Sequence, residues 1–246
     1  MLDSRPGDGY GDGGGAPMSR IRIPEGARIP EGVRDVPPRR PETVPYITAW
    51  SAERAPAPIV TGRPSVGVAY EDEDLFDRDG EGVLWTRALS RPGQGRPEFG
   101  DVHPLRQRRA MRRLLCQVCG GPADRNEQGV LWLLGDHRED WPGWPENMAA
   151  THPPVCLPCA GQSVRACPHL GRGFVAVRVK SPRVSGVYGA RYHPANPFDG
   201  PVEDVVKAYG DCGIRWVVAS QLAMELRDCT FVDLEAELAA AAARKR

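Results

Sequence analysis

The chain of 246 residues contains 28 glycines and 25 prolines, which together make up about a fifth of its length and nearly twice the usual share. No run of about 20 apolar residues is present, which excludes a membrane-spanning helix, and the glycines lack the three-residue period of collagen. The 32 basic and 32 acidic side chains cancel, which argues against a protein that coats nucleic acid through bulk charge.

Residues 1–43 are predicted to be a disordered tail. A glycine-rich stretch covers 7–15, and the pentapeptide Arg-Ile-Pro-Glu-Gly occurs at 22–26 and again at 28–32. Two copies do not indicate a repeat fold, because solenoid units need about three neighbours to bury a core. The prolines that follow favour an extended chain.

Residues 44–102 are predicted to form a weakly folded segment with three short strands. β-branched and aromatic residues mark these strands at 46–50, 65–70 and 82–86. Between the last two lies an acidic run, residues 71–81, with seven acids and one base. We expect this run to be a solvated loop.

A basic helix is predicted over 104–115, where Pro104 is tolerated in the first turn. The surrounding residues 103–115 hold five arginines and no acid. Their clustered positive charge makes them the candidate nucleic-acid-binding residues; they are Arg106, Arg108, Arg109, Arg112 and Arg113. Alternatively, the acidic run 71–81 folds onto this helix and neutralises it within the molecule.

Two Cys-x-x-Cys pairs follow the basic helix, Cys116 with Cys119 and Cys156 with Cys159. A two-residue gap allows both thiolates of one tight turn to reach the same ion, and two pairs supply the four sulfurs of a closed structural zinc site. An iron–sulfur cluster uses the same ligands and stays open as an alternative. The chain begins without the pattern of a secretory signal, so we expect a cytoplasmic protein with reduced thiols rather than disulfides.

A further cysteine and two histidines nearby are secondary candidates. Cys167 and His169 follow Cys159 by about two helical turns, and either could replace a ligand or form a second site with His152. The simpler expectation is that Cys167 packs at the end of a helix.

The order of predicted elements between 116 and 167 resembles the treble-clef zinc finger. A knuckle carries the first cysteine pair, a strand or hairpin arm follows at 129–134, and a helix at 159–166 begins with the second pair. The resemblance implies a zinc-organised lobe within an α+β protein. It implies a fold and a metal rather than an activity.

One treble-clef family with chemistry is the HNH endonucleases, in which Asp-His and then Asn lie between the cysteine pairs. Asp136, His137 and Asn147 follow this order here. The resemblance implies that His137 would be the general base for water and that Asp136 would hold a divalent ion on the scissile phosphate. The chain departs from the pattern at Ala160, where the family usually offers a metal-binding histidine or asparagine.

Residues 171–246 are predicted to form a β-hairpin followed by helices. The hairpin comprises strands at 174–180 and 184–188 around a Ser-Pro turn. A first helix is predicted at 214–227 from the four-residue spacing of its apolar side chains.

A second C-terminal helix is predicted at 233–246, which is alanine-rich, acidic at its start and basic at its end, as suits the helix dipole. The apolar faces of both helices are a candidate surface for a protein partner or for a second copy of the chain.

These observations together predict a small α+β protein with a zinc lobe and basic helix at 103–170. The predicted function is non-catalytic binding, to nucleic acid or to a protein partner, with structural Zn²⁺ and without a membrane or a small-molecule substrate. The alternative is an HNH-like metal-dependent nuclease that uses Asp136, His137 and Asn147.

Overall fold

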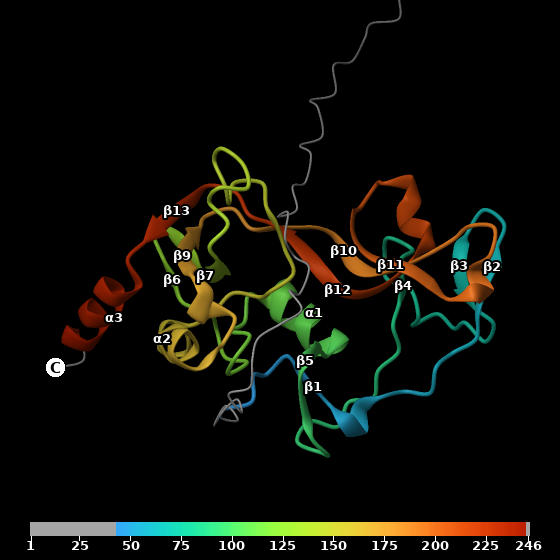
Figure 1. Ribbon diagram of the computed structural model, residues 1–246, viewed down its shortest axis with the longest axis horizontal. Helices are drawn as coiled ribbons and strands as arrows, with labels where there is room; N and C mark the ends of the chain where they lie inside the picture. The colour runs from blue at the N-terminus through green and yellow to red at the C-terminus, as the bar shows by residue number, and fades with distance from the viewer. Residues whose placement is uncertain (1–42, 245–246) are drawn as a thin grey trace, which may run out of the picture.

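The computed structural model describes residues 43–244 (Figure 1). This part of the chain is a mixed α+β structure, as predicted, with two larger sheets, two two-stranded ribbons and three α-helices. The predicted tail 1–43 lies outside the described residues, apart from Thr43. None of the helices in the described part has the length and apolar character needed to cross a membrane.

The largest sheet has five strands that come from distant parts of the chain. Its main path runs through β11 (Pro201–Ala208), β10 (Arg183–Tyr192), β12 (Val217–Glu225) and β4 (Leu84–Trp85), and β8 (Ala149–Ala150) pairs with the far end of β12. The β12–β4 pair is parallel and the other pairs are antiparallel.

The second sheet has four antiparallel strands. Their order is β13 (Cys229–Val232), β9 (Phe174–Val179), β7 (Gly129–Gly135) and β6 (Arg125–Asn126). Each large sheet combines strands from different predicted segments. β9 of segment 171–246 pairs with β7 of segment 103–170, and β12 of segment 171–246 pairs with β4 of segment 44–102.

Two antiparallel ribbons complete the β-structure. One pairs β1 (Thr48–Trp50) with β5 (Pro97–Val102), and the other pairs β2 (Val60–Arg63) with β3 (Gly67–Tyr70). The three strands predicted in the first segment are therefore present as β1, β3 and β4.

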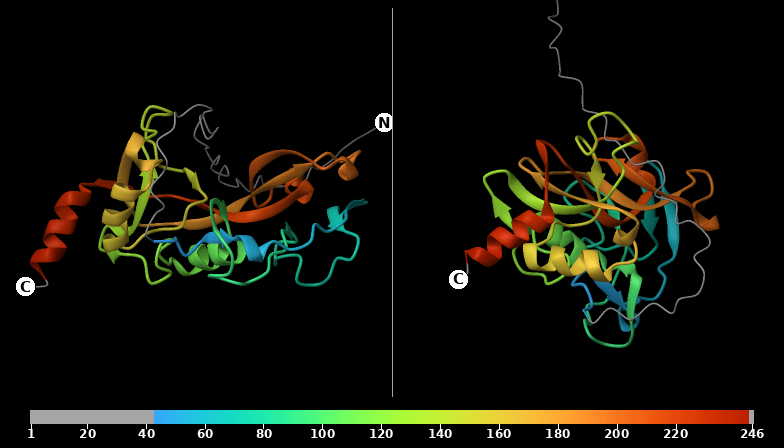
Figure 2. Two further views of the ribbon diagram at one scale, coloured as in Figure 1. Left: turned by 60° about the horizontal axis from the view of Figure 1, so that its bottom comes forward. Right: turned by 60° about the vertical axis from the view of Figure 1, so that its left-hand side comes forward.

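The three helices are α1 (Pro104–Arg113), α2 (Leu157–Ala166) and α3 (Leu234–Ala243). The molecule is elongated, with α3 and the β2–β3 ribbon at opposite ends and α1 between them (Figures 1 and 2). The helices predicted at 104–115, 159–166 and 233–246 are present, and the last two residues of the chain lie outside the described part.

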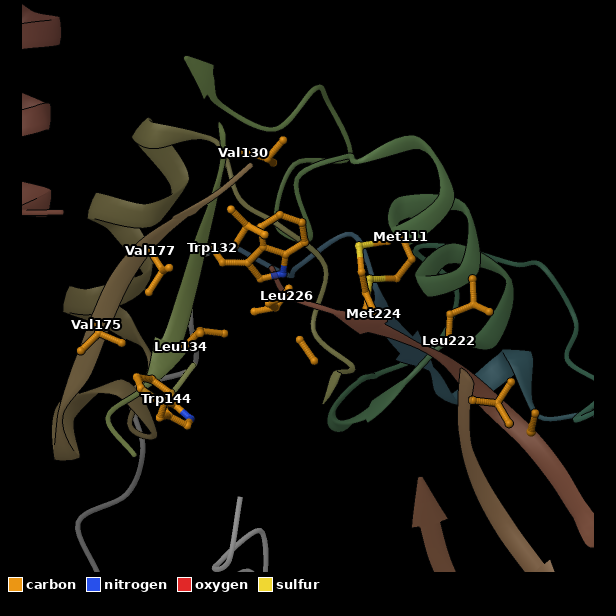
Figure 3. Close-up of a cluster of buried hydrophobic side chains, with 14 of the residues drawn as sticks. Met111, Val130, Trp132, Leu134, Trp144, Val175, Val177, Leu222, Met224 and Leu226 are labelled. Atoms are coloured by element: carbon orange, nitrogen blue, oxygen red, sulfur yellow. The ribbon is translucent and has the colours of Figure 1, made fainter. Parts of the chain in front are cut away.

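One hydrophobic core joins the two large sheets to α1. Trp132 and Val177 come from the second sheet, Leu222 and Met224 from β12, and Met111 from α1. Figure 3 shows Met111 on the green helix facing Met224 and Leu222, with Trp132 and Val177 on the other side. Removal of these side chains from water supplies the main driving force that holds the two sheets together.

The strand β7 is apolar throughout because both of its faces are covered. Val130, Trp132 and Leu134 line the core shared with β12, whereas Leu131 and Leu133 line a second core beside α2 and α3. Successive side chains of a strand point to opposite faces, and a strand buried on both faces has a continuous apolar sequence.

The helix predicted at 214–227 is wrong, because most of this segment is β12. A spacing of four places Val218 and Leu222 on one face of a helix, but in β12 these two side chains lie in different cores on opposite faces of the strand. Both faces of β12 are largely buried, so its sequence shows no polar stripe. Within the described residues, the predicted pair of C-terminal helices is reduced to α3.

A β-bulge in β12 further hides its strand character. Tyr188 of β10 pairs with Gln221, but the next residue, Gly189, pairs with Ala219, so Ser220 is an extra residue on β12. A bulge shifts the alternation by one residue. Odd-numbered side chains of β12 enter the main core before the bulge and even-numbered side chains enter it afterwards.

The hairpin predicted at 174–188 is also wrong, although both of its strands exist. β9 pairs with β7 and β13, whereas β10 pairs with β11 and β12. Between them the N–H of Lys180 donates to the Asp228 carbonyl, and the N–H of Ser181 donates to the Arg227 carbonyl, both at 3.2 Å. These bonds lead the chain from one sheet into the other.

Candidate metal centre

Four cysteine side chains meet at one point of the fold. The Sγ atoms of Cys116, Cys119, Cys156 and Cys159 all lie within 4.8 Å of one another, and those of Cys119 and Cys156 are 3.8 Å apart. Within residues 43–244 this is the one group of three or more histidine, cysteine or acidic side chains close enough to hold a metal ion. The predicted convergence of the two pairs is confirmed.

The first pair lies in a tight knuckle. The Cys116 N–H donates to the Gly121 carbonyl at 2.7 Å, and the Gly120 N–H donates to the Cys116 carbonyl at 2.9 Å. The Val118 N–H points at Cys116 Sγ, 3.4 Å away. Gly120 has a φ of +71°, and a Cβ atom there would lie 2.9 Å from the ring of Tyr46. The turn therefore needs glycine for its backbone angle and for its close packing.

The second pair lies at the start of α2. Cys156 is the N-cap residue and Cys159 lies in the first turn. The free N–H groups and the dipole at a helix N-terminus favour negative charge, which offsets part of the cost of burying thiolates there. Pro158 is tolerated there because the first turn lacks intrahelical N–H partners.

Backbone hydrogen bonds bring the two pairs together. The Gln117 N–H donates to the Pro154 carbonyl at 3.0 Å, and the Asp124 N–H donates to the Val155 carbonyl at 3.1 Å. Val155 in turn donates to the Leu131 carbonyl of β7 at 2.9 Å. The segment before α2 is thus held against both the knuckle and the second sheet.

Burial and hydrogen bonds shift the pKa values of three of the four thiols in different directions. Burial opposes ionisation of Cys119, but hydrogen bonds from the Gly121 N–H and from the neighbouring thiols hold its pKa below the ordinary value. Burial raises the pKa of Cys156 to about 11 and also raises the pKa of Cys159. Four thiolates at this distance are stable only beside a cation, which would release the remaining protons as it binds.

The geometry of the group fits a single ion. Four sulfurs placed about 2.3 Å from one ion at the corners of a tetrahedron lie about 3.8 Å apart, which is the separation of the Cys119 and Cys156 sulfurs. An iron–sulfur cluster divides its cysteines among several irons, so its sulfurs would be more widely spread than these.

The secondary candidates lie outside this group. Cys167 is the C-cap residue of α2, and its N–H donates to the Ser163 carbonyl at 2.8 Å. Neither His169 nor His152 joins a metal-binding group in the described part of the chain. The four cysteines are therefore close enough to supply four ligands to one ion without them.

A small hydrophobic core supports the cysteines. It includes Leu131 and Leu133 of β7, Leu157 of α2 and Leu234 of α3, and the buried Cys116 packs among them. Small cores of this kind supply little stabilisation by themselves, and structural metal ions commonly supplement them.

The knuckle also holds the segment that leads to β1. The N–H of Tyr46 donates to the Val118 carbonyl at 2.8 Å, and the N–H of Ile47 donates to the Gln117 carbonyl at 3.2 Å. The Ile47 carbonyl accepts a bond of 2.7 Å from the N–H of His103, the N-cap residue of α1. A continuous set of backbone contacts thus links the cysteine group to the arginine-rich helix.

Arg106, one of the predicted nucleic-acid contacts, lies in the interior. Its Nη1 and Nη2 atoms donate to the Glu53 carboxylate at 2.6 and 2.7 Å, and Nη2 also donates to the Thr48 carbonyl at 2.7 Å. Burial opposes ionisation of Glu53, but these bonds and two backbone N–H groups lower its pKa to about 2. Arg106 therefore anchors α1 and is not available to a partner. Sequence reasoning missed this pair because nothing local relates residues so far apart.

The other four arginines of α1 have different environments. The Arg108 guanidinium lies 3.9 Å from the centre of the Trp85 ring, a cation–π contact. Arg109 donates to the Tyr46 hydroxyl at 3.2 Å. Arg109, Arg112 and Arg113 are exposed, so three of the five predicted residues form a basic surface.

The acidic run 71–81 forms ion pairs with arginines close to it in sequence. Arg78 binds Glu73 at 2.8 Å, and Arg87 binds the buried Asp77 at 2.6 Å. These pairs neutralise part of the run within its own segment, and no ion pair of the described residues joins the run to the exposed arginines of α1.

The residues of the nuclease alternative lie in a loop after β7. The Asp136 carboxylate pairs with Arg138 at 2.6 Å, and the His137 ring lies 3.5 Å from the Asp140 carboxylate. Asn147 lies in a turn with a φ of +62°. No group that could hold a metal ion forms around these residues within the described ranges.

Comparison with known proteins found no match: no family model, no curated protein and no solved structure resembles this chain.

Proposed function

We propose that the protein is a non-catalytic zinc-binding protein, in which one structural Zn²⁺ held by the four cysteines organises the lobe around α2. The observation that carries this proposal is the convergence of four sulfurs within 4.8 Å. Four thiolates fill a tetrahedral coordination sphere and leave no position for water or substrate, which is typical of structural rather than catalytic zinc.

The order of elements supports a treble-clef-like lobe. The knuckle comes first, the β6–β7 hairpin follows, and α2 carries the second pair at its N-terminus. In this arrangement the ion links a loop to a helix across a small core, and metal binding contributes directly to the free energy of folding.

Elemental analysis of purified protein tests the metal assignment. We expect one zinc per chain, loss of that zinc in Cys119→Ser, and full retention in the control Cys212→Ser, which alters an exposed cysteine outside the group. Metal-free protein, or iron with sulfide in place of zinc, would contradict the assignment.

We propose that the zinc lobe supports a surface for nucleic acid on α1. Three exposed arginines, Arg109, Arg112 and Arg113, lie on one short helix. The buried ion pair between Arg106 and Glu53 anchors this helix on its interior side, so the exposed surface is preorganised. Neutralisation of phosphates by such a cluster is local and needs no overall positive charge.

Fluorescence anisotropy with a labelled duplex tests this surface. We expect the affinity to fall as salt rises, and the double variant Arg112→Ala with Arg113→Ala to bind more weakly with a salt slope reduced by about two. The matched control is Arg91→Ala with Arg96→Ala, two exposed arginines outside α1, which should bind like wild type. A complete absence of binding at low salt would reject this part of the proposal.

The HNH-like nuclease stays a prediction with less support, because the Asp136 carboxylate is already paired with Arg138. Plasmid nicking with magnesium or manganese distinguishes the two functions. If the protein is non-catalytic, wild type and His137→Ala should show the same background level of nicking. A loss of nicking in the variant would favour the nuclease.

A further inference from the structure

The loop between β3 and β4 presents two adjacent large apolar residues to solvent. Leu75 is 94% exposed and Phe76 is 92% exposed, the highest values among the exposed large apolar residues of the described chain. Single exposed apolar residues are common, but an adjacent pair at the tip of a loop is a candidate contact surface. The folded core gives no reason for their position.

The loop that carries this pair is held in one conformation. The Asp77 carboxylate is bound by Arg87 and by the N–H of Asp74, at 2.6 and 2.9 Å. The Phe76 N–H donates to Asp74 Oδ1 at 2.7 Å. At the base, Arg78 donates to the carbonyl groups of the flanking chain. A tip fixed in this way loses little conformational entropy when it binds.

The negative charge around the tip indicates the charge that a partner surface should carry. Glu71 and Asp74 are exposed on the same loop, and no ion pair of the described residues uses either of them, whereas the exposed Asp72 is already paired with Arg87 at 3.0 Å. A complementary surface therefore has an exposed apolar side chain flanked by cations.

The chain itself carries such a surface on α1. Leu105 is 46% exposed, and Arg109 and Arg112 follow it at the spacings of four and three that place side chains on one helix face. Neither arginine forms an ion pair within the described residues. We infer that a second copy of the chain occupies this face. Leu75 and Phe76 of that copy contact Leu105. Glu71 and Asp74 of the same copy pair with the two arginines.

A reciprocal contact would close a two-fold dimer, because each copy offers one acidic tip and one basic helix face. The basic face is the same one proposed for nucleic acid, so dimerisation and nucleic-acid binding would compete. Self-association is measured without nucleic acid, and its result is therefore independent of the proposed function.

Sedimentation velocity of the full, zinc-loaded chain tests the inference. We expect a monomer–dimer equilibrium that weakens at high salt. Phe76→Ser should raise the dimer dissociation constant at least about tenfold, whereas the control Phe198→Ser, which alters another phenylalanine that is 73% exposed, should leave it unchanged. Near-ultraviolet circular dichroism of both variants should match that of wild type.

A charge exchange tests the pairing of the two surfaces. Arg112→Glu alone should weaken the dimer, and addition of Glu71→Arg to that variant should restore it. A monomer at every concentration would overturn the inference, as would equal effects of Phe76→Ser and Phe198→Ser. A dimer that Arg112→Glu leaves unchanged would also overturn the role of α1.

Discussion

The side chain of Gln107 pairs with the backbone of Leu222 as a neighbouring strand would. Its Nε2 atom donates to the Leu222 carbonyl, and its Oε1 atom accepts from the Leu222 N–H, both at 2.9 Å. The same Nε2 atom donates to the Thr151 carbonyl at 2.7 Å. One fully buried side chain of α1 thus satisfies backbone groups of β12 near its bulge and of the segment that follows β8.

Replacement of Gln107 should therefore be costly. Gln107→Ala leaves the two buried backbone groups of Leu222 and the partly buried Thr151 carbonyl without these partners, and we expect the free energy of unfolding to fall by about 2–4 kcal/mol. Chemical denaturation measures this change, and the exposed Gln128→Ala is the control. Equal stabilities of the two variants would show that water replaces the lost bonds.

Metal removal should destabilise the fold rather than leave an intact apoprotein. The cysteine group holds the knuckle to α2, and the knuckle holds the segment before β1. We expect a strong chelator to lower the melting temperature of wild type, by an amount that Cys156→Ser reproduces without chelator. Thermal melts with and without chelator check this; an unchanged melting temperature would mean that the backbone contacts suffice.

Gly120→Ala should weaken the knuckle without removing a ligand. The positive φ and the contact with the Tyr46 ring both disfavour a Cβ atom, and we expect a loss of about 1–3 kcal/mol with weaker zinc retention. Gly80→Ala is the matched control, because a Cβ atom there meets nothing within 4 Å. Zinc retention under chelator competition compares the two variants.

The Glu53–Arg106 pair should make stability dependent on pH in the acid range. The folded pKa of Glu53, about 2, lies below its ordinary value of 4.5. The resulting stability is therefore fully present above about pH 4.5 and is lost as the pH falls towards 2, by up to about 3 kcal/mol.

Glu53→Gln tests this pH dependence. The variant should be less stable than wild type at pH 7, because Arg106 is left buried without a counter-ion, and the difference should narrow on acidification. Denaturation at a series of pH values measures the difference, and a gap that stays constant down to pH 2 would contradict the assignment.

Local patterns predicted the parts of this fold that depend on local chemistry. The spacing of Cys116 and Cys119, repeated by Cys156 and Cys159, restricts both pairs to one kind of turn, so their convergence could be predicted without a fold. The basic helix and α3 were also predicted from periodicity and charge.

The errors arose where distant contacts decide the outcome. The four-residue spacing of Val218 and Leu222 fits one face of a helix, but in β12 the bulge and the burial of both faces place the two side chains in different cores. The interior position of Arg106 depends on Glu53, which reaches it through tertiary packing alone. Neither the burial of β12 nor the Glu53–Arg106 pair can be predicted from a short stretch of sequence.

The burial of both faces of β7 has a consequence for the fluorescence of the protein. Leu131 and Leu133 face the side of the cysteines, while the intervening Trp132 faces the main core. Any displacement of this strand by events at the sulfurs must move the indole as well. We therefore expect the emission of Trp132, on the opposite face of the sheet, to change with the state of the cysteine cluster, together with the signal of the other five tryptophans.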